Sequence, residues 1–308
     1  MNMIKIFPHL LNIFNFMKKR RHTVEIILPI IALSSVLILI LIIVFVLNEA
    51  LPALLLLGPG LILNEKWRPY YEEYGALPLI LGSLLIVSGS VLIAVPLGVL
   101  SAIFLTEYLP RSLREPFRSV IELLAAIPSI IYGFLGMMFI APAISDLFEV
   151  PLGKTALAGS IVLSMMIVPT IVSISSEVIA SVPKEYKMAA LALGATKWQC
   201  IRSVVLPTAM PGIFASILLA LGRAIGETVA VLMVCGCVPT IPSPLWNYLS
   251  PVHTLTSAIA LDMGEVAIGS LHYHVLFGLG VILMVITFTV NTIADLLLKR
   301  APRSVIRI

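Results

Sequence analysis

Charged residues are scarce in this sequence. They make up 12% of its 308 residues, whereas hydrophobic residues make up 59%. A soluble domain carries about 25% charged residues, and half of that share is too little to give a chain of this size a water-facing surface. The composition therefore excludes an ordinary soluble protein and indicates a chain whose main solvent is lipid.

Cysteine is also rare. The three cysteines, Cys200, Cys235 and Cys237, form no C-x-x-C pair, and their odd number argues against a disulfide framework or a zinc site. We interpret Cys235 and Cys237 as small apolar residues at the end of a helix, in preference to a redox pair. The sequence also lacks a G-x-x-x-x-G-K-S/T phosphate-binding loop, so the chain is not expected to hydrolyse ATP or to hold a cofactor of its own.

Long apolar runs are what the sequence does have. The first covers residues 26–47, and at about 1.5 Å per residue it reaches roughly 33 Å, enough to cross the hydrocarbon core of a bilayer. It follows a basic cluster at 18–21, as a signal peptide would, but it is longer than a signal peptide's apolar region and no A-x-A-like cleavage site follows closely. We therefore predict a retained transmembrane helix. Five more spans are expected near 77–105, 120–144, 155–179, 211–234 and 275–298.

These spans predict an all-α integral membrane protein with six transmembrane helices and no soluble domain. The predicted organisation is a tail at 1–25, a first transmembrane helix at 26–47, a loop at 48–76, a five-helix core at 77–298 and a tail at 299–308. Sixteen Lys and Arg residues fall in the tails and the second and fourth connections, and three fall on the opposite side. By the positive-inside rule both tails are cytoplasmic and the 48–76 loop is extracytoplasmic, in a multi-pass plasma membrane protein.

One basic residue, Arg223, is left inside the fifth span, four residues before Glu227. At this spacing two helical side chains share one face, and each charge costs about 2.5–3.5 kcal/mol at the bilayer centre. One interpretation is a self-neutralising ion pair, and the other is that both residues line a translocation path. An Arg fork matches phosphate oxygens, and a carboxylate accepts from the P–OH group that phosphate keeps near neutral pH and sulfate lacks. A second positive group, from a partner, is expected to complete the neutralisation.

Other polar residues near the ends of the spans are expected to be interfacial. Glu122 follows Arg118 by four residues, a spacing typical of an ion pair on a helix. Glu177 is expected to be solvated. His272 and His274 are two histidines without further ligands, so we expect interfacial residues and no metal site there.

The connection between the fourth and fifth spans, residues 181–207, predicts two short helices joined by a tight turn. Pro183 can begin the first helix, and Gly194 is placed to cap its end. Thr196 and Gln199 then match a capping box that opens a second helix, expected to end before Pro207. An alanine-rich face of this kind suits docking into a groove on another protein, although an ordinary exposed turn between two helices would have the same sequence pattern.

Residues 183–207 contain Ala189 and Ala190, then Gly194 four residues on, then Val204–Pro207. With this pattern they resemble the EAA loop of ABC importer permeases. The resemblance implies a coupling helix that seats in the ATPase subunit. Met188 stands where the family usually has glutamate, which takes a carboxylate out of the loop, and Val204 stands conservatively for isoleucine. The matching positions expected to couple to the ATPase are Met188, Ala189, Ala190, Gly194, Leu206 and Pro207.

Further segments extend the resemblance to roughly residues 65–300. They are Trp67–Pro69, Glu73–Gly75, Thr106–Pro110, Ile121–Gly133 and Leu221–Thr228, and together they resemble the PstC-type membrane subunit of bacterial and archaeal phosphate importers. The resemblance implies the type I ABC importer permease fold and alternating access. It implies as partners a PstA-type permease, a PstB-type ATPase dimer that holds the ATP and magnesium, and an extracytoplasmic PstS-type phosphate-binding protein. Its expected substrate pathway comprises Arg223, Glu227, Pro128 and Ser129.

Three rival functions stay open at this point. A permease for another oxyanion, such as molybdate, sulfate or phosphonate, would share the coupling loop. A proton-coupled secondary carrier could use Arg223 and Glu227 as its relay, but it has no need of a docking loop. A structural or sensory scaffold would leave the two intramembrane charges unexplained.

Overall fold

The computed structural model describes residues 7–300, with side chains for 28–293, 295 and 296, so the predicted tails lie partly outside it. The helices are α1 (Phe7–Leu57), α2 (Gly60–Leu63), α3 (Leu77–Ile103), α4 (Arg111–Ala126), α5 (Ser129–Leu135), α6 (Ala141–Phe148), α7 (Ala156–Ser181), α8 (Lys184–Ala192), α9 (Lys197–Cys200), α10 (Leu206–Gly226), α11 (Val229–Val234), α12 (Leu255–Asp262) and α13 (Leu271–Arg300). A 3-10 turn, η1 (Pro69–Tyr71), separates strands β1 (Trp67–Arg68) and β2 (Glu73–Tyr74). Three π-helical segments, η2 (Phe104–Tyr108), η3 (Gly136–Ile140) and η4 (Ile201–Val205), continue longer helices.

Six helical stretches among the described residues are long and apolar enough to cross a membrane. They are Leu28–Leu57, Leu77–Tyr108, Ser129–Phe148, Ala156–Ser181, Lys197–Gly226 and Leu271–Ile293. The predicted all-α fold with six transmembrane helices is therefore confirmed.

The third span differs from its predicted range of 120–144. The backbone breaks at Ile127 and Pro128, with ψ angles of 129° and 140°. A proline disfavours the helical conformation of the residue before it, so α4 ends at Ala126 and the span runs from Ser129 to Phe148. Helix α4 is a separate amphipathic helix that carries most of the charged residues of this region.

The fifth span, predicted at 211–234, is also placed differently. It begins at Lys197 and is continuous to Gly226, and α11 follows only after a break at Glu227 and Thr228. The prediction that a short helix ends before Pro207 is wrong, because the chain runs from α9 through η4 into α10. Pro207 lies in the first turn of α10, directly after the π-helical segment, whose wider turn moves backbone carbonyls away from the proline ring.

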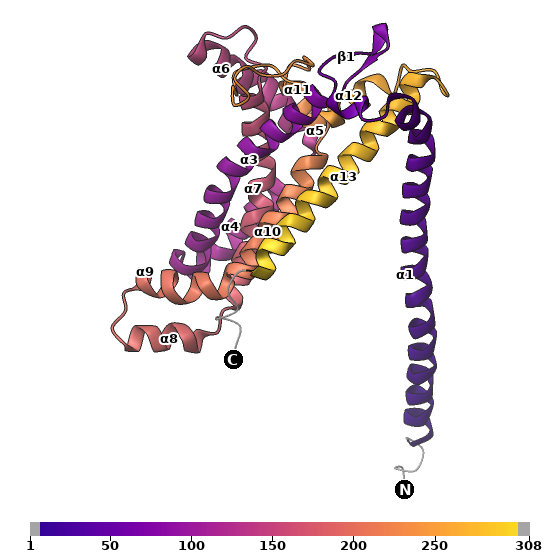
Figure 1. The fold of residues 1–308 in the computed structure, drawn as a ribbon. Helices are drawn as coiled ribbons and strands as arrows, with labels where there is room; N and C mark the ends of the chain where they lie inside the picture. The colour runs from indigo at the N-terminus through magenta and orange to yellow at the C-terminus, as the bar shows by residue number, and fades with distance from the viewer. Residues whose placement is uncertain (1–6, 301–308) are drawn as a thin grey trace.

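The spans form a bundle with α1 standing apart from it (Figure 1). Helix α1 meets the bundle through α13, while α7 packs against both α3 and α10. The α3–α7 contact is close: a Cβ atom on Gly98 would lie 2.7 Å from Ile171, so only glycine fits there. Helices α8 and α9 project at one end, and β1, α6 and α12 lie at the other (Figure 1).

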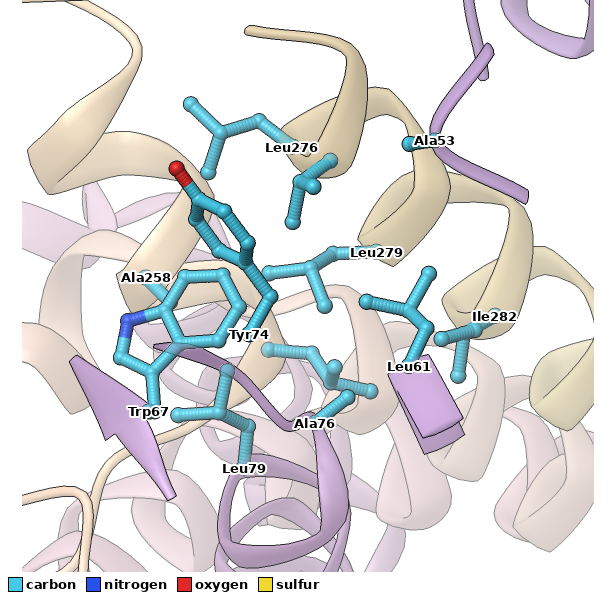
Figure 2. Packing of buried hydrophobic residues seen from close by; sticks show 12 residues of the cluster. Ala53, Leu61, Trp67, Tyr74, Ala76, Leu79, Ala258, Leu276, Leu279 and Ile282 are labelled. Atoms are coloured by element: carbon cyan, nitrogen blue, oxygen red, sulfur yellow. The ribbon is translucent and has the colours of Figure 1, made fainter. Parts of the chain in front are cut away.

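A hydrophobic cluster closes the end of the bundle that carries α12 (Figure 2). Strands β1 and β2 pair antiparallel, with Trp67 opposite Tyr74 and their ring centroids 6.0 Å apart. Both rings are buried with Leu79 of α3 and Leu276 of α13. The segment predicted as a loop at 48–76 is therefore largely ordered: α1 extends to Leu57, and α2 and the hairpin pack on the bundle.

Candidate functional site

Two breaks in the helices lie next to each other in the bundle. The first separates α4 from α5 at Ile127–Pro128, and the second separates α10 from α11 at Glu227–Thr228. Helices α5 and α11, which follow these breaks, pack against each other, because Gly133 allows the backbone of Ala230 to approach: a Cβ on Gly133 would lie 2.9 Å from the Ala230 Cα. In membrane proteins, broken helices are tolerated where protein or a water-filled cavity surrounds the break.

Arg223 and Glu227 lie on either side of the second break. Arg223 is exposed in the last turn of α10, where a cation is favoured by the helix dipole. Glu227 is half-buried and has an extended backbone, with ψ 130°. The prediction that they share one helical face is therefore wrong, because the helix ends between them. They form no ion pair with each other in the described part of the chain, which also removes the self-neutralising interpretation.

Each of the two charged groups has other neighbours. The Glu227 carboxylate accepts a hydrogen bond from the backbone N–H of Ala230 at 3.2 Å, at the start of α11. Its carbonyl accepts from the Thr256 hydroxyl at 2.9 Å, which ties the break to α12. Arg223 acts electrostatically on the hydroxyl of Tyr132 in α5. That hydroxyl donates to the Leu124 carbonyl at 2.8 Å, across the first break.

A small, partly open pocket lies beside Glu227. Its polar lining comes from three elements that are far apart in the sequence: Ser83 of α3, Glu227 at the break, and Thr254 and Thr256 at the start of α12. The Ser83 hydroxyl accepts from the backbone N–H of Leu255 at 2.9 Å, which fixes α12 against α3. The remaining lining is apolar: Ile86, Val87, Leu163, Ala224, Ile225 and Val231.

The sequence-based site is thus only partly brought together. Glu227 lines the pocket, whereas Arg223, Pro128 and Ser129 do not. Pro128 and Ser129 begin α5 at the neighbouring break. Sequence reasoning missed Ser83, Thr254 and Thr256, although Thr254 could have been found as the start of a helix, because it forms a capping box with Ser257.

Helices α8 and α9 form the hairpin that the sequence predicted. Gly194 takes a left-handed φ of +82° after α8, and the Thr196 hydroxyl accepts from the Gln199 N–H at 3.3 Å. The Gln199 side chain accepts from the Thr196 N–H at 2.8 Å, so the predicted capping box is confirmed. Helix α8 begins after Pro183, which is its N-cap residue.

The coupling positions separate into two groups in the structure. Met188, Ala189 and Gly194 are exposed on the hairpin, and Met188 is 67% exposed. The others are partly buried: Ala190, Leu206 and Pro207. Leu206 and Pro207 begin α10, so they lie in the span rather than on the hairpin.

Polar contacts fasten the hairpin to the end of the second span. Lys187 of α8 forms an ion pair with Glu107 of η2 at 2.5 Å, and their side chains are only 20% and 13% exposed. The Lys197 ammonium lies 4.5 Å from the centroid of the Tyr108 ring. The Cys200 thiol lies 3.8 Å from the Lys187 carbonyl. The hairpin is therefore held against η2 at several points.

A second ion-pair network joins α4 to α7 at this end. Arg118 pairs with Glu122 at 2.9 Å, as predicted. Arg118 also pairs with Glu177, whose side chain is 55% exposed, so Glu177 is solvated as expected and also joins an ion pair that was not predicted. At the opposite end, His272 lies 3.4 Å from Asp262, and His274 donates from Nδ1 to the Glu49 carbonyl at 2.7 Å.

The family is decided by comparison with known sequences. The profile of the binding-protein-dependent transport system inner membrane component matches residues 94–307. The chain belongs to this family. The permease called YqgH of Bacillus subtilis, a probable ABC transporter permease, is 42% identical over 225 residues, 72% of each chain. The phosphate transport system permease PstC of Mesorhizobium japonicum is 40% identical over 267 residues, 80% of each chain, and PstC of Xylella fastidiosa 9a5c is 38% identical over 270 residues, 82% of each.

Solved importer permeases share the fold of this inner membrane component. A subunit of the MetNI methionine ABC transporter, in an inward-facing conformation, matches with a TM-score of 0.56 and 18% identity, over 72% of this chain and 94% of that one. A subunit of a bacterial alginate ABC transporter in complex with its binding protein matches with a TM-score of 0.55 and 16% identity, over 85% and 92%. The predicted resemblance to PstC-type permeases and the predicted importer fold are both confirmed. The chain is an ABC permease component rather than an enzyme, and it works with an ATPase and a binding protein.

Proposed function

We propose that this chain is the PstC-type membrane subunit of an ATP-driven importer of inorganic phosphate. The observation that carries the proposal is the similarity to PstC permeases at 38–40% identity over 80–82% of the chain. The substrate pathway passes by the paired helix breaks, with Arg223 and Glu227 as its charged groups and Pro128 and Ser129 at the neighbouring break. The small pocket beside Glu227 lies along that proposed pathway.

The chemistry of the two charged groups favours phosphate. The exposed Arg223 guanidinium offers planar donors to the oxygens of the anion. The Glu227 carboxylate accepts from a P–OH group and repels an anion that has no proton to donate. Because the helix ends between them, the two side chains are not paired with each other. Glu227 accepts the Ala230 N–H at one carboxylate oxygen, which leaves the other oxygen for a substrate, and Arg223 is exposed. The second positive group belongs to the partner permease.

The partners are a PstA-type permease, a PstB-type ATPase dimer and a PstS-type binding protein. The exposed part of the hairpin around Met188 seats in the ATPase subunit, which places α8, α9 and both termini in the cytoplasm. The rod from Lys197 to Gly226 joins the hairpin directly to the break at Glu227, and at about 1.5 Å per residue it is roughly 45 Å long. Movement of the ATPase dimer therefore reaches the substrate pathway through one continuous helix, and alternating access follows.

Transport by the assembled complex tests the substrate. The four kinds of subunit are reconstituted in vesicles, and uptake of phosphate, sulfate, molybdate and phosphonate is measured with ATP on the ATPase side. We expect uptake of phosphate alone. Faster uptake of another oxyanion would show that this anion, and not phosphate, is the substrate.

Two variants test the site and the docking surface. Glu227→Gln keeps the size of the side chain but removes its negative charge, so we expect the ratio of sulfate uptake to phosphate uptake to rise. An unchanged ratio would show that Glu227 does not contribute to the selective site. Met188→Arg is expected to weaken binding of the ATPase subunit. Tyr70→Ala is the matched control, because Tyr70 is 95% exposed at the opposite end of the bundle. Equal ATPase binding by the two variants would contradict the assignment of the docking surface.

A further inference from the structure

Two of the three cysteines lie together at the end of α11. Cys235 is the C-cap residue of α11 and is fully buried, and Cys237 is partly exposed. Their sulfur atoms are 3.7 Å apart. The pair lies outside the six membrane-spanning stretches, at the end of the bundle away from α8 and α9.

The backbone is shaped to fold one cysteine back on the other. Gly236 and Cys237 both have left-handed backbones, with φ of +85° and +51°, and the second is unusual for a residue with a side chain. A Cβ on Gly236 would lie 2.8 Å from the Lys154 carbonyl, so glycine is required at this position. The backbone N–H of Val252 donates to the Cys235 carbonyl at 2.9 Å and holds the turn in place. The close approach of the sulfurs therefore comes from an ordered turn.

The two thiols have different environments. Hydrogen bonding from Cys235, together with the side chains of His253 and Lys154, lowers the pKa of Cys237 to about 5, against desolvation by burial. The pKa of Cys235 is raised, first by its hydrogen bond to Cys237 and then by burial. His253 is held in place through its Nδ1 atom, 2.8 Å from the Ser257 hydroxyl. Cys237 is thus the partly exposed member of the pair and has the lower pKa, and Cys235 is the buried member with the higher pKa.

From this juxtaposition we propose that Cys235 and Cys237 are a redox-active dithiol that closes to an intramolecular disulfide by exchange with a disulfide oxidant. The Cys237 thiolate attacks one sulfur of the oxidant, and the other sulfur leaves as a thiolate. Cys235 then loses its proton and attacks the Cys237 sulfur, which releases the second thiolate of the oxidant. Two protein thiols and one oxidant disulfide become one protein disulfide and two small thiols, so the electrons balance.

Two alternatives fit these residues less well. A metal site is disfavoured, because the described residues contain no group of three His, Cys, Asp or Glu side chains placed to hold an ion. A packing role alone explains the burial of Cys235 but not the left-handed turn at Gly236 and Cys237, which brings the partly exposed Cys237 sulfur to 3.7 Å from the Cys235 sulfur. The dithiol accounts for the division of the pair into an attacking and a resolving thiol.

Trapping the intermediate tests the proposal. The assembled transporter carrying Cys200→Ser, which removes the third, distant thiol, is incubated with oxidised glutathione, and free thiols are counted after denaturation. We expect both thiols to be lost and the mass to fall by two hydrogens. Adding Cys235→Ser should leave a glutathione adduct on Cys237, and adding Cys237→Ser should leave a free Cys235. Two thiols still free after equilibration, or an adduct on Cys235 instead, would overturn the proposal.

Alkylation gives an independent readout that does not depend on disulfide closure. In the Cys200→Ser protein under reducing conditions, iodoacetamide should label Cys237 at a rate that changes less than about twofold between pH 6 and pH 7.5. An ordinary thiol with a pKa near 8.5 would speed up roughly 30-fold over the same range. A rise of that size at Cys237 would show an ordinary thiol and refute its role as the attacking group.

Discussion

Replacing Glu107 with Gln leaves the Lys187 ammonium without its carboxylate partner at the base of the hairpin. The two side chains are 13% and 20% exposed, so the pair is neither free in solvent nor fully enclosed. Exposed pairs contribute about 0–1 kcal/mol, and breaking a buried pair costs about 3–5 kcal/mol. We therefore expect the substitution to lower the free energy of unfolding by about 1–3 kcal/mol.

A double-mutant cycle isolates the contribution of the pair. The free energy of unfolding in detergent is measured for Glu107→Gln, Lys187→Gln and the double variant, and the charge swap Glu107→Lys with Lys187→Glu should recover part of the loss. Glu122→Gln is the control, because its partner Arg118 is 42% exposed and Glu122 is 55% exposed, so the expected loss is below about 1 kcal/mol. A coupling energy no larger for Glu107 and Lys187 than for the exposed pair would refute the reasoning.

The pair also predicts a functional defect. If Lys187 and Glu107 hold the hairpin to the second span, their loss should let the hairpin move without the bundle. ATP hydrolysis by the assembled transporter should then continue while the amount of phosphate moved per ATP falls. If a variant with lower stability still moves the same amount of phosphate per ATP, the ion pair stabilises the fold without transmitting motion.

Three further predictions concern local packing, each checked by the free energy of unfolding in detergent. Gly194→Ala should cost about 1–2 kcal/mol, because the φ of Gly194 is +82°, which is left-handed, although no atom would contact the added methyl group within 4 Å. Gly226 has equally open surroundings and no positive φ, so Gly226→Ala should cost nothing. Equal losses for the two variants would contradict the assignment of the cost to backbone strain. Gly133→Ala should cost about 1–3 kcal/mol, because the added methyl group would lie 2.8 Å from Met233 and 2.9 Å from Ala230. Gly222→Ala is the control and should be neutral, because the nearest atom to a methyl group at Gly222 is 4.0 Å away. Thr196→Ala should cost about 1 kcal/mol by removing the helix cap, and no loss would mean that the capping box does not stabilise α9.

The features that the sequence predicted well are local in origin. A long apolar run is enough to define a membrane span, which is why all six spans were found. The hairpin was predicted because its ends are set by neighbouring residues: Pro183 at the start, Gly194 in a left-handed turn and Thr196 with Gln199 in a capping box. None of these signals needs a contact from elsewhere in the chain.

The features that were missed depend on tertiary contacts or on breaks too short to alter hydropathy. Two non-helical residues, Glu227 and Thr228, interrupt an otherwise apolar segment, so the fifth span was drawn through them and the shared face of Arg223 and Glu227 was wrong. Pro207 was read as a stop because a π-helical segment cannot be seen in the sequence. The pocket requires Ser83 and Thr256 to meet across the bundle, which only the fold determines.

The energy source of phosphate uptake tests the central claim most directly. In vesicles that contain the complete transporter and its binding protein, initial uptake is measured with ATP on the ATPase side and no proton gradient, and then with a proton gradient and no ATP. ATP-driven phosphate import predicts uptake in the first condition and none in the second. Uptake that persists without ATP and stops when the gradient is collapsed would show a proton-coupled carrier and contradict the account.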